Sequence, residues 1–311
     1  MIKQLTYHTP EVFTQQYARY FLSSVESMFG FSGKNVPNFF FDLSKTKTIN
    51  ILGLLLIYKF LEYTVEHKCF KNPVCNLREC HYVSKELERY GFKKLVYAFI
   101  NDDIPNYDLK FKEEDEFFIA PIVLDRGADF CSVEGQYAAK INRFYSYDSK
   151  ASFVSLQCLG ELSSNFIAHA KNDTKSVLAA RGNREYVELA CADTGVGIIS
   201  NLKPLFSATS SNYQILSKSL EKGVTSKLNS AHMGYGLWLI NEFVTIGKGE
   251  LAVFSEGAYY INAGGKIKSG QCAHWKGTII YIKITMKDTK VYSEVLKKLE
   301  PEVDDINLQR V

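Results

Sequence analysis

The C-terminal half of the chain combines helical patterns with short apolar runs that end at glycines. Residues 152–170 carry apolar side chains at helical spacing, which predicts a long helix. Residues 237–243 follow a pair of glycines and predict a second helix. Strands are predicted by short apolar runs at residues 186–192, 251–254, 259–262 and 278–285. Helices beside several short strands predict an α+β sandwich with an antiparallel or mixed sheet.

The preceding residues alternate between strand-like and helical patterns. Residues 38–43 form an apolar run that predicts a buried strand. Residues 51–66 carry apolar side chains at helical spacing, with Lys59, Glu62 and Glu66 on a polar side. This alternation predicts a small α/β unit over residues 36–110.

Between these two regions, residues 117–124 predict a strand, and Pro121 predicts that this strand lies at a sheet edge because proline cannot donate to a ladder. We therefore divide the chain into five parts. They are an N-terminal helix and linker (1–35), the small α/β domain (36–110), a connecting strand and helix (111–150), the larger domain (151–287) and a helical tail (288–311).

Composition excludes several classes of protein. Apolar residues make up 46% of the chain and charged residues 23%, which is typical of a globular protein and excludes a disordered one. The net charge of +3 predicts no direct binding of nucleic acid. Residues 48–58 form the longest uncharged apolar run, shorter than the ~20 residues that a membrane span needs. With scattered cysteines and no signal peptide, we expect a cytoplasmic protein without a membrane partner.

Two histidines and three cysteines lie close together in the sequence, namely His67, Cys69, Cys75, Cys80 and His81. A zinc site would need four of them in a tetrahedral set. The lack of a C-x-x-C pair argues against zinc and favours these cysteines as small hydrophobic residues, although the sequence leaves the question open.

Three polar residues form one stripe of the predicted helix 152–170. Glu161, Asn165 and His169 follow one another at intervals of four residues, so they project from one face. A solvated helix face would explain this stripe, and so would a metal–nucleotide site. In the second case the Asn165 amide oxygen is a hard ligand suited to Mg²⁺, and Glu161 could deprotonate a nucleophile.

Two glycine motifs follow in the chain. The first, at 193–197 (DTGVG), comes directly after a predicted strand, where its aspartate could accept a hydrogen bond from an adenine amine. The second, at 234–237 (GYGL), opens a helix, whose free amides and dipole favour phosphate. A turn or a helix cap would explain either motif alone. The polar residues 199–232 between them predict a long loop that is either a lid or disordered, and from a lid Lys222 and Lys227 could approach phosphate.

The order and spacing of these motifs resemble the GHKL ATPase superfamily, which includes gyrase-type topoisomerases, chaperones of the Hsp-ninety type, histidine kinases and MutL proteins. The resemblance covers residues 150–285 and includes Gly277-Thr278, similar to the Gly-Thr pair behind the adenine pocket. Residues 161–169 (ELSSNFIAH) are most similar to the anti-sigma-factor kinase branch. The resemblance implies helices on one face of a mixed sheet, with ATP and Mg²⁺ as cofactors.

The resemblance also implies roles for the residues in these motifs. Glu161 would be the general base, and Asn165 would hold Mg²⁺. Asp193 would accept a hydrogen bond from adenine N6, with Thr278 supporting it. The other ATP-binding candidates are His169, Gly195, Gly197, Lys227, Gly234, Tyr235, Gly236 and Leu237.

The small N-terminal unit resembles a STAS-type domain, the fold of anti-sigma-factor antagonists. In that family a partner kinase phosphorylates a serine at the start of the helix that begins here near residue 51. The matching residues 50–53 (NILG) carry no hydroxyl group. The unit is therefore expected to pack on the ATPase half or to regulate it.

Together these resemblances imply an enzyme that binds Mg-ATP and acts as an ATPase or a Ser/Thr kinase-like regulatory switch with a nucleotide-gated lid. We expect it to act on a protein partner or as a homodimer. The alternative is a non-catalytic, nucleotide-sensing module that regulates a partner by docking. Transfer to water and transfer to a protein need the same base and metal, so the sequence does not separate them.

Overall fold

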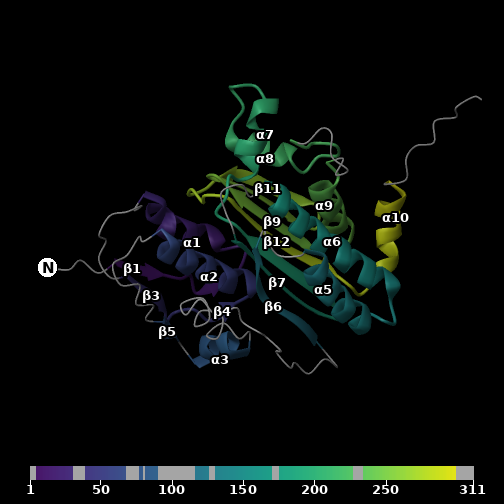
Figure 1. The fold of residues 1–311 in the computed structure, drawn as a ribbon, viewed down its shortest axis with the longest axis horizontal. Coiled ribbons are helices and arrows are strands. Elements are labelled where there is room, and N and C mark those ends of the chain that lie inside the picture. The colour runs from purple at the N-terminus through teal and green to yellow at the C-terminus, as the bar shows by residue number, and fades with distance from the viewer. Residues whose placement is uncertain are drawn as a thin grey trace, which may run out of the picture.

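The computed structural model describes residues 5–30, 39–67, 77–79, 81–89, 116–125, 130–169, 175–226 and 234–298. Its centre is a seven-stranded sheet in the order β11-β10-β9-β12-β8-β7-β6 (Figure 1). The strands are β6 (Glu116–Asp125), β7 (Lys175–Asn183), β8 (Tyr186–Ala192), β9 (Glu250–Ser255), β10 (Ala258–Ala263), β11 (Lys266–Gln271) and β12 (Thr278–Thr285). Every neighbouring pair in this sheet is antiparallel, which confirms one of the two arrangements that the sequence pattern left open. The mixed sheet implied by the resemblance was wrong.

The edge position predicted from Pro121 is confirmed. Among the strands that the structure describes, β6 pairs only with β7, and its register shifts between Ile119 and Ile122, on either side of the proline. This strand therefore belongs to the large sheet, although the sequence placed it in a connecting segment. The following helix α5 (Phe130–Phe144) packs on α6 (Ser149–His169) in the same layer.

The central strands are mostly apolar because both faces of the sheet are covered, and the charged Glu188 of β8 is buried as well. In β8, Val187, Leu189 and Cys191 belong to the core beneath the C-terminal helices. The alternate residues Ala190 and Ala192 belong to a second core beneath the N-terminal unit. Successive side chains of a strand point to opposite faces, so a strand buried on both sides loses the usual polar alternation.

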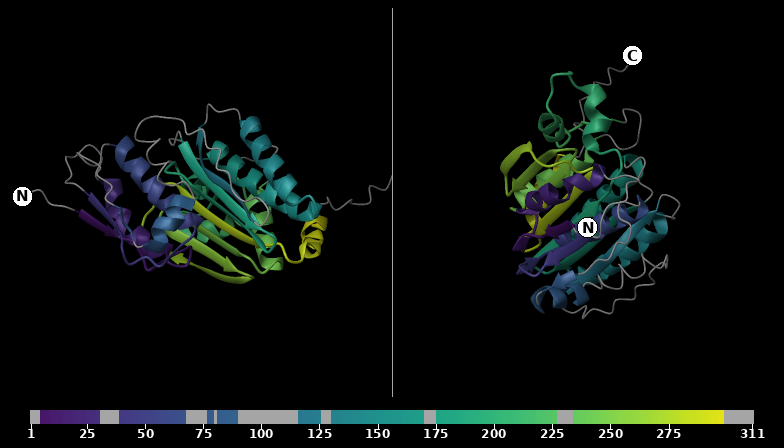
Figure 2. Two further views of the ribbon diagram at one scale, coloured as in Figure 1. Left: turned by 90° about the horizontal axis from the view of Figure 1, so that it is seen from below. Right: turned by 90° about the vertical axis from the view of Figure 1, so that its left-hand side faces the viewer.

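Helices α5, α6, α9 (Gly236–Ile246) and α10 (Tyr292–Lys297) cover one face of the sheet (Figure 1). The helices expected near 152–170 and 237–243 are thereby confirmed as α6 and α9. The segment predicted as a lid contains α7 (Ile198–Leu202), the 3₁₀ helix η2 (Lys203–Leu205) and α8 (Asn212–Lys218). Helix α8 packs on β10 and β11 (Figure 2).

The N-terminal unit covers the opposite face and holds a parallel sheet in the order β1-β3-β5. Its elements are β1 (Leu5–His8), β2 (Val12–Phe13), α1 (Ala18–Val25), the 3₁₀ helix η1 (Glu26–Gly30), β3 (Phe39–Leu43), β4 (Thr48–Ile49), α2 (Ile51–Glu66), β5 (Leu77–Glu79) and α3 (His81–Arg89). The predicted alternation of strands and helices is confirmed. Because β1 pairs with β3, residues 5–8 belong to this unit rather than to a separate linker.

Helix α2 is buried over residues 51–64, because it lies between the small parallel sheet and strands β7 and β8 of the large one. The sequence placed Lys59, Glu62 and Glu66 on a polar side. Glu66 is exposed, but the prediction was wrong for Lys59 and Glu62. Both residues are fully buried, and Lys59 Nζ lies 2.5 Å from Glu62 Oε2. Within the described ranges no helix is both long enough and apolar enough to cross a bilayer.

Candidate functional site

Helices α6 and α9 meet where Glu161 faces the start of α9. A Cβ atom added to Gly236, the first residue of α9, would lie 2.0 Å from Glu161 Oε2 and 2.8 Å from its Cδ. The carboxylate therefore lies directly against the backbone at the N-terminus of α9. Glycine permits this approach, and the positive end of the helix dipole favours a negative charge there.

Asn165 lies one turn further along α6 than Glu161. Its Nδ2 atom is buried and has no hydrogen-bond partner in the described structure. A buried amide N–H left without a partner costs about 1–3 kcal/mol, and a ligand that accepts a hydrogen bond from it would offset that cost. The other member of this stripe, His169, ends α6, and its side chain lies outside the described part of the structure.

Asp193 follows the last residue of β8 and is held by its neighbours from several directions. Its backbone N–H donates to the Thr278 carbonyl at 2.9 Å, and its own carbonyl accepts from Trp275 Nε1 at 2.9 Å. Its Oδ1 accepts from the Gly195 N–H at 2.9 Å. Only 8% of the residue is exposed. These contacts fix the direction of the carboxylate at the end of the strand.

Gly277 lies directly against the backbone and side chain of Asp193. A Cβ atom at this position would lie 2.4 Å from the Asp193 carbonyl oxygen and 2.5 Å from Oδ1. The φ angle of Gly277 is +93°, a conformation that other residues adopt only with strain. The Gly-Thr pair noted in the sequence is thus the point where β12 approaches Asp193 most closely.

Ser255 connects these pieces, and the sequence analysis did not identify it. Its Oγ accepts from the Ile198 N–H at 3.1 Å, donates to the Gly277 carbonyl at 2.8 Å and lies 3.4 Å from Thr278 Oγ1. It therefore ties the residue after Gly197 to the start of β12. Ser255 could be found only from its pairing with Thr278 across β9 and β12, and the sequence alone does not give the register of these strands.

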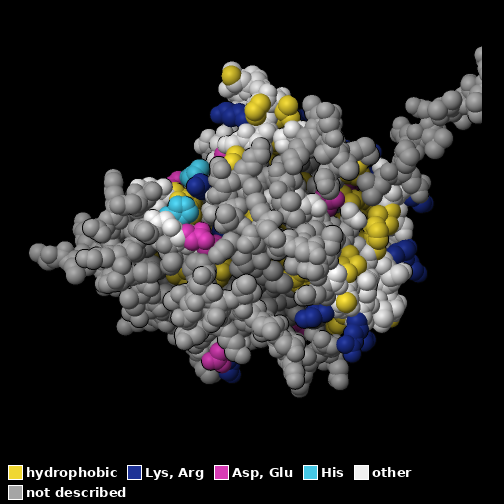
Figure 3. Space-filling model, viewed as in Figure 1, with side chains coloured by type: hydrophobic (Ala, Val, Ile, Leu, Met, Phe, Trp, Pro, Cys, Tyr) yellow, Lys and Arg dark blue, Asp and Glu magenta, His cyan; other side chains and the backbone are white. Residues whose placement is uncertain are grey.

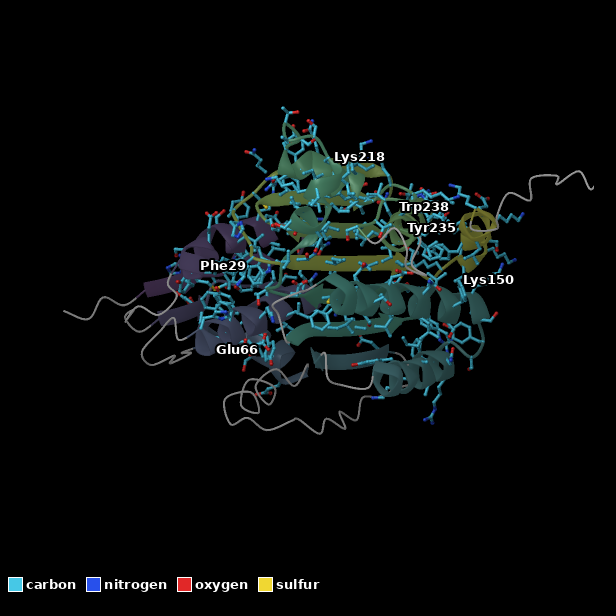
Figure 4. All side chains as sticks on the ribbon, turned by 45° about the horizontal axis from the view of Figure 1, so that its top comes forward. Phe29, Glu66, Lys150, Lys218, Tyr235 and Trp238 are labelled. Atoms are coloured by element: carbon cyan, nitrogen blue, oxygen red, sulfur yellow. The ribbon has the colours of Figure 1, made fainter. Side chains whose placement is uncertain are left out.

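The start of α9 is supported by the residues that follow α8. The Gly234 carbonyl accepts from the Gly223 N–H at 3.2 Å. The Lys222 ammonium lies 5.5 Å from the Tyr235 ring and 5.3 Å from the Trp238 ring, and it donates to the Lys298 carbonyl at 3.0 Å. Figure 4 shows Tyr235 and Trp238 side by side here. Lys222 is thus near the expected phosphate position but is held by α9 and the tail.

The structure therefore forms two groups of predicted residues. Glu161 lies against Gly236, with Asn165 one turn away, and Asp193 is grouped with Gly195 and Thr278. Residues near each group belong to the core beneath the C-terminal helices, whereas Trp275, which donates to the Asp193 carbonyl, belongs to the core beneath the N-terminal unit. The members near the groups are Leu162, Phe166, Ile199, Trp238, Leu239 and Ile280. The side chain of Leu237 packs against the core beneath the C-terminal helices, and Lys227 lies outside the described residues.

Cys158 and Cys191 are buried, and Cys272 is half-buried. Burial raises the pKa of Cys272 to about 11, and it also raises the pKa of Cys158. Both thiols are therefore protonated at neutral pH and unreactive as thiolates. Cys69, Cys75 and Cys80 lie outside the described residues, so the zinc question stays open. Elsewhere in the described ranges, no cluster of His, Cys, Asp or Glu could hold a metal ion.

Lys and Arg side chains are spread over the visible face of the described residues rather than gathered into one stripe (Figure 3). A protein that tracks a phosphate backbone concentrates its basic residues, so this distribution agrees with the small net charge.

In comparisons with protein-family models, curated proteins and solved structures, no match to the chain was found.

A Gly277→Ala variant tests whether the approach to Asp193 requires glycine. We expect the free energy of unfolding to fall by at least about 1–3 kcal/mol, because alanine is strained at this φ angle and its Cβ overlaps Asp193. Gly135→Ala in α5 is the matched control, since its Cβ would meet nothing within 4 Å. Urea unfolding measures both variants, and equal stability of the two would contradict the need for glycine at position 277.

Proposed function

We propose that this chain binds Mg-ATP as a GHKL-type ATPase or protein kinase-like switch. The observation that carries the proposal is the contact between Glu161 and the glycine that begins α9. It sets a general base beside a helix N-terminus that can bind the phosphates of a nucleotide. The fixed carboxylate of Asp193 supports the same proposal, because it offers an acceptor for the adenine amine.

Each residue of the proposed site would have its own role in this reaction. Asp193 and Thr278 would hold the adenine ring, and the amides at residues 234–237 would bind the phosphates. Asn165, one turn of α6 from Glu161, would offer its Oδ1 to the ion, because Mg²⁺ takes oxygen ligands. The Mg²⁺ it would hold offsets the charge of the phosphates. Glu161 would take the proton from the attacking water or protein hydroxyl.

We propose that the N-terminal unit is STAS-like and regulates the nucleotide site rather than accepting phosphate. At the residue where the related antagonists carry a serine, Asn50 caps α2, and its Oδ1 accepts from the Gly53 N–H at 3.1 Å. Its Nδ2 donates to Gln15 Oε1 at 3.0 Å, and only 6% of the residue is exposed. A buried amide engaged in this way offers no phosphate acceptor. The partner of the switch would be another protein or a second copy of the chain.

Asn165→Ala tests the metal ligand. We expect calorimetry to detect no binding of Mg-ATP to this variant, because the oxygen that holds the ion is removed. Ser164→Ala, on the neighbouring position of α6, is expected to bind as the wild type does. Tight Mg-ATP binding by Asn165→Ala would contradict the assignment of this residue.

A further inference from the structure

The N-terminal unit touches the loop that holds Asp193. The Phe29 ring of η1 lies edge-on to Trp275, with ring centroids 5.4 Å apart and planes at 86°. The backbone N–H of His274 donates to Glu26 Oε1 at 2.7 Å. Phe29 also packs on Tyr63 of α2, with ring centroids 5.0 Å apart. Figure 4 shows Phe29 in the N-terminal unit where it adjoins the large sheet.

Trp275 is fully buried and connects this contact to the candidate site. Its indole N–H donates to the Asp193 carbonyl at 2.9 Å, while its own carbonyl accepts from the Glu256 N–H at 3.1 Å. The Asp193 N–H is held from the other side by Thr278. The indole of Trp275 therefore contacts Phe29 through its ring and Asp193 through its nitrogen.

We propose that Trp275 is a positioning residue through which the N-terminal unit sets the selectivity of the nucleotide site for adenine. This inference rests on the proposed function. The indole hydrogen bond holds the backbone of Asp193, and the backbone in turn determines where the carboxylate meets the base. Docking of the N-terminal unit and binding of ATP are then linked, and linkage between two equilibria is reciprocal. The contact of Phe29 with Trp275 is the physical connection between them.

Comparing adenine with guanine nucleotides separates a positioning role of Trp275 from a purely structural one. Adenine presents an amine to Asp193, whereas guanine presents a carbonyl oxygen at the same position. A misplaced carboxylate should therefore weaken ATP binding and leave weak GTP binding nearly unchanged. A general loss of stability would instead lower the binding of both nucleotides by the same factor.

The experiment compares Trp275→Phe and Phe29→Leu in the full chain. Calorimetry with Mg-ATP and Mg-GTP is expected to show roughly fivefold weaker ATP binding for Trp275→Phe, the size typical of one buried hydrogen bond. Phe29→Leu should lower the ATP-to-GTP ratio in the same direction by a smaller factor. Tyr145→Phe is the matched control, because it removes a buried donor to the Asn183 carbonyl at 2.7 Å, away from the site. Its ratio should equal that of the wild type.

A second readout uses the protein without nucleotide. In urea unfolding, the effects of Trp275→Phe and Phe29→Leu should not add in the double variant, because the two rings are in contact. An unchanged ATP-to-GTP ratio in both single variants would overturn this inference while the wild type still binds ATP. If the wild type binds neither nucleotide, both the proposed function and this inference are overturned.

Discussion

Glu161→Gln is expected to lower the turnover of ATP by about 100-fold to 10,000-fold, the range that a general base contributes. Glutamine keeps the size of the side chain and its position against Gly236, where the carboxylate now lies. It removes the group that accepts the proton. We therefore expect calorimetry to show Mg-ATP affinity close to that of the wild type, while the release of phosphate, measured with labelled ATP, falls.

Glu185→Gln is the matched control for this prediction, because Glu185 is an exposed carboxylate that pairs with Lys287 at the surface. It should turn over ATP at the wild-type rate. Turnover that persists in Glu161→Gln would exclude the residue as the base. Wild-type protein that binds ATP without measurable turnover or transfer, with or without candidate partners, would favour the non-catalytic docking module.

Lys59→Met is expected to lower the free energy of unfolding by about 3–5 kcal/mol, because it leaves the charge of Glu62 buried without the lysine. The pair lies inside α2, where the exposed fractions of the two side chains are 1% and 0%. Urea unfolding at neutral pH measures this loss. The effect tests whether α2 is the buried centre of the N-terminal unit, as the structure shows.

The double variant Lys59→Met with Glu62→Leu supplies the control. Replacing a buried ion pair by apolar residues of similar volume is often neutral or stabilising, so most of the lost stability should return. If the single variant were as stable as the wild type, the helix would have solvent at this position. Such a result would contradict the packing of α2 between the two sheets.

The sequence predicted elements best where tertiary burial and local pattern agree. Strands β8 and β12 match the predicted runs because most of their residues are apolar on both faces. Strand β11, with the sequence KIKSGQ, escaped prediction because it is an exposed edge strand with little apolar character. The polar side expected for α2 was wrong for Lys59 and Glu62, since these two residues form a buried ion pair within the helix.

In the candidate site, too, residues with a local sequence pattern were predicted, and residues that depend on tertiary contacts were missed. Glu161 and the glycine motif of α9 were found by spacing, and the structure brings them into contact. Ser255 and Trp275 were missed because their importance depends on the register of β9 with β12 and on a loop that folds back onto Asp193. Spacing along a chain reveals residues on one element, whereas contacts between distant elements require the fold.

A crystal structure of the chain with Mg²⁺ and a non-hydrolysable ATP analogue tests the proposed site most directly. We expect the adenine amine at Asp193, the phosphates at the amides that begin α9, and the ion at Asn165 with Glu161 facing the terminal phosphate. A nucleotide bound elsewhere, or an analogue that leaves Asn165 and Asp193 without contact, would contradict the proposal.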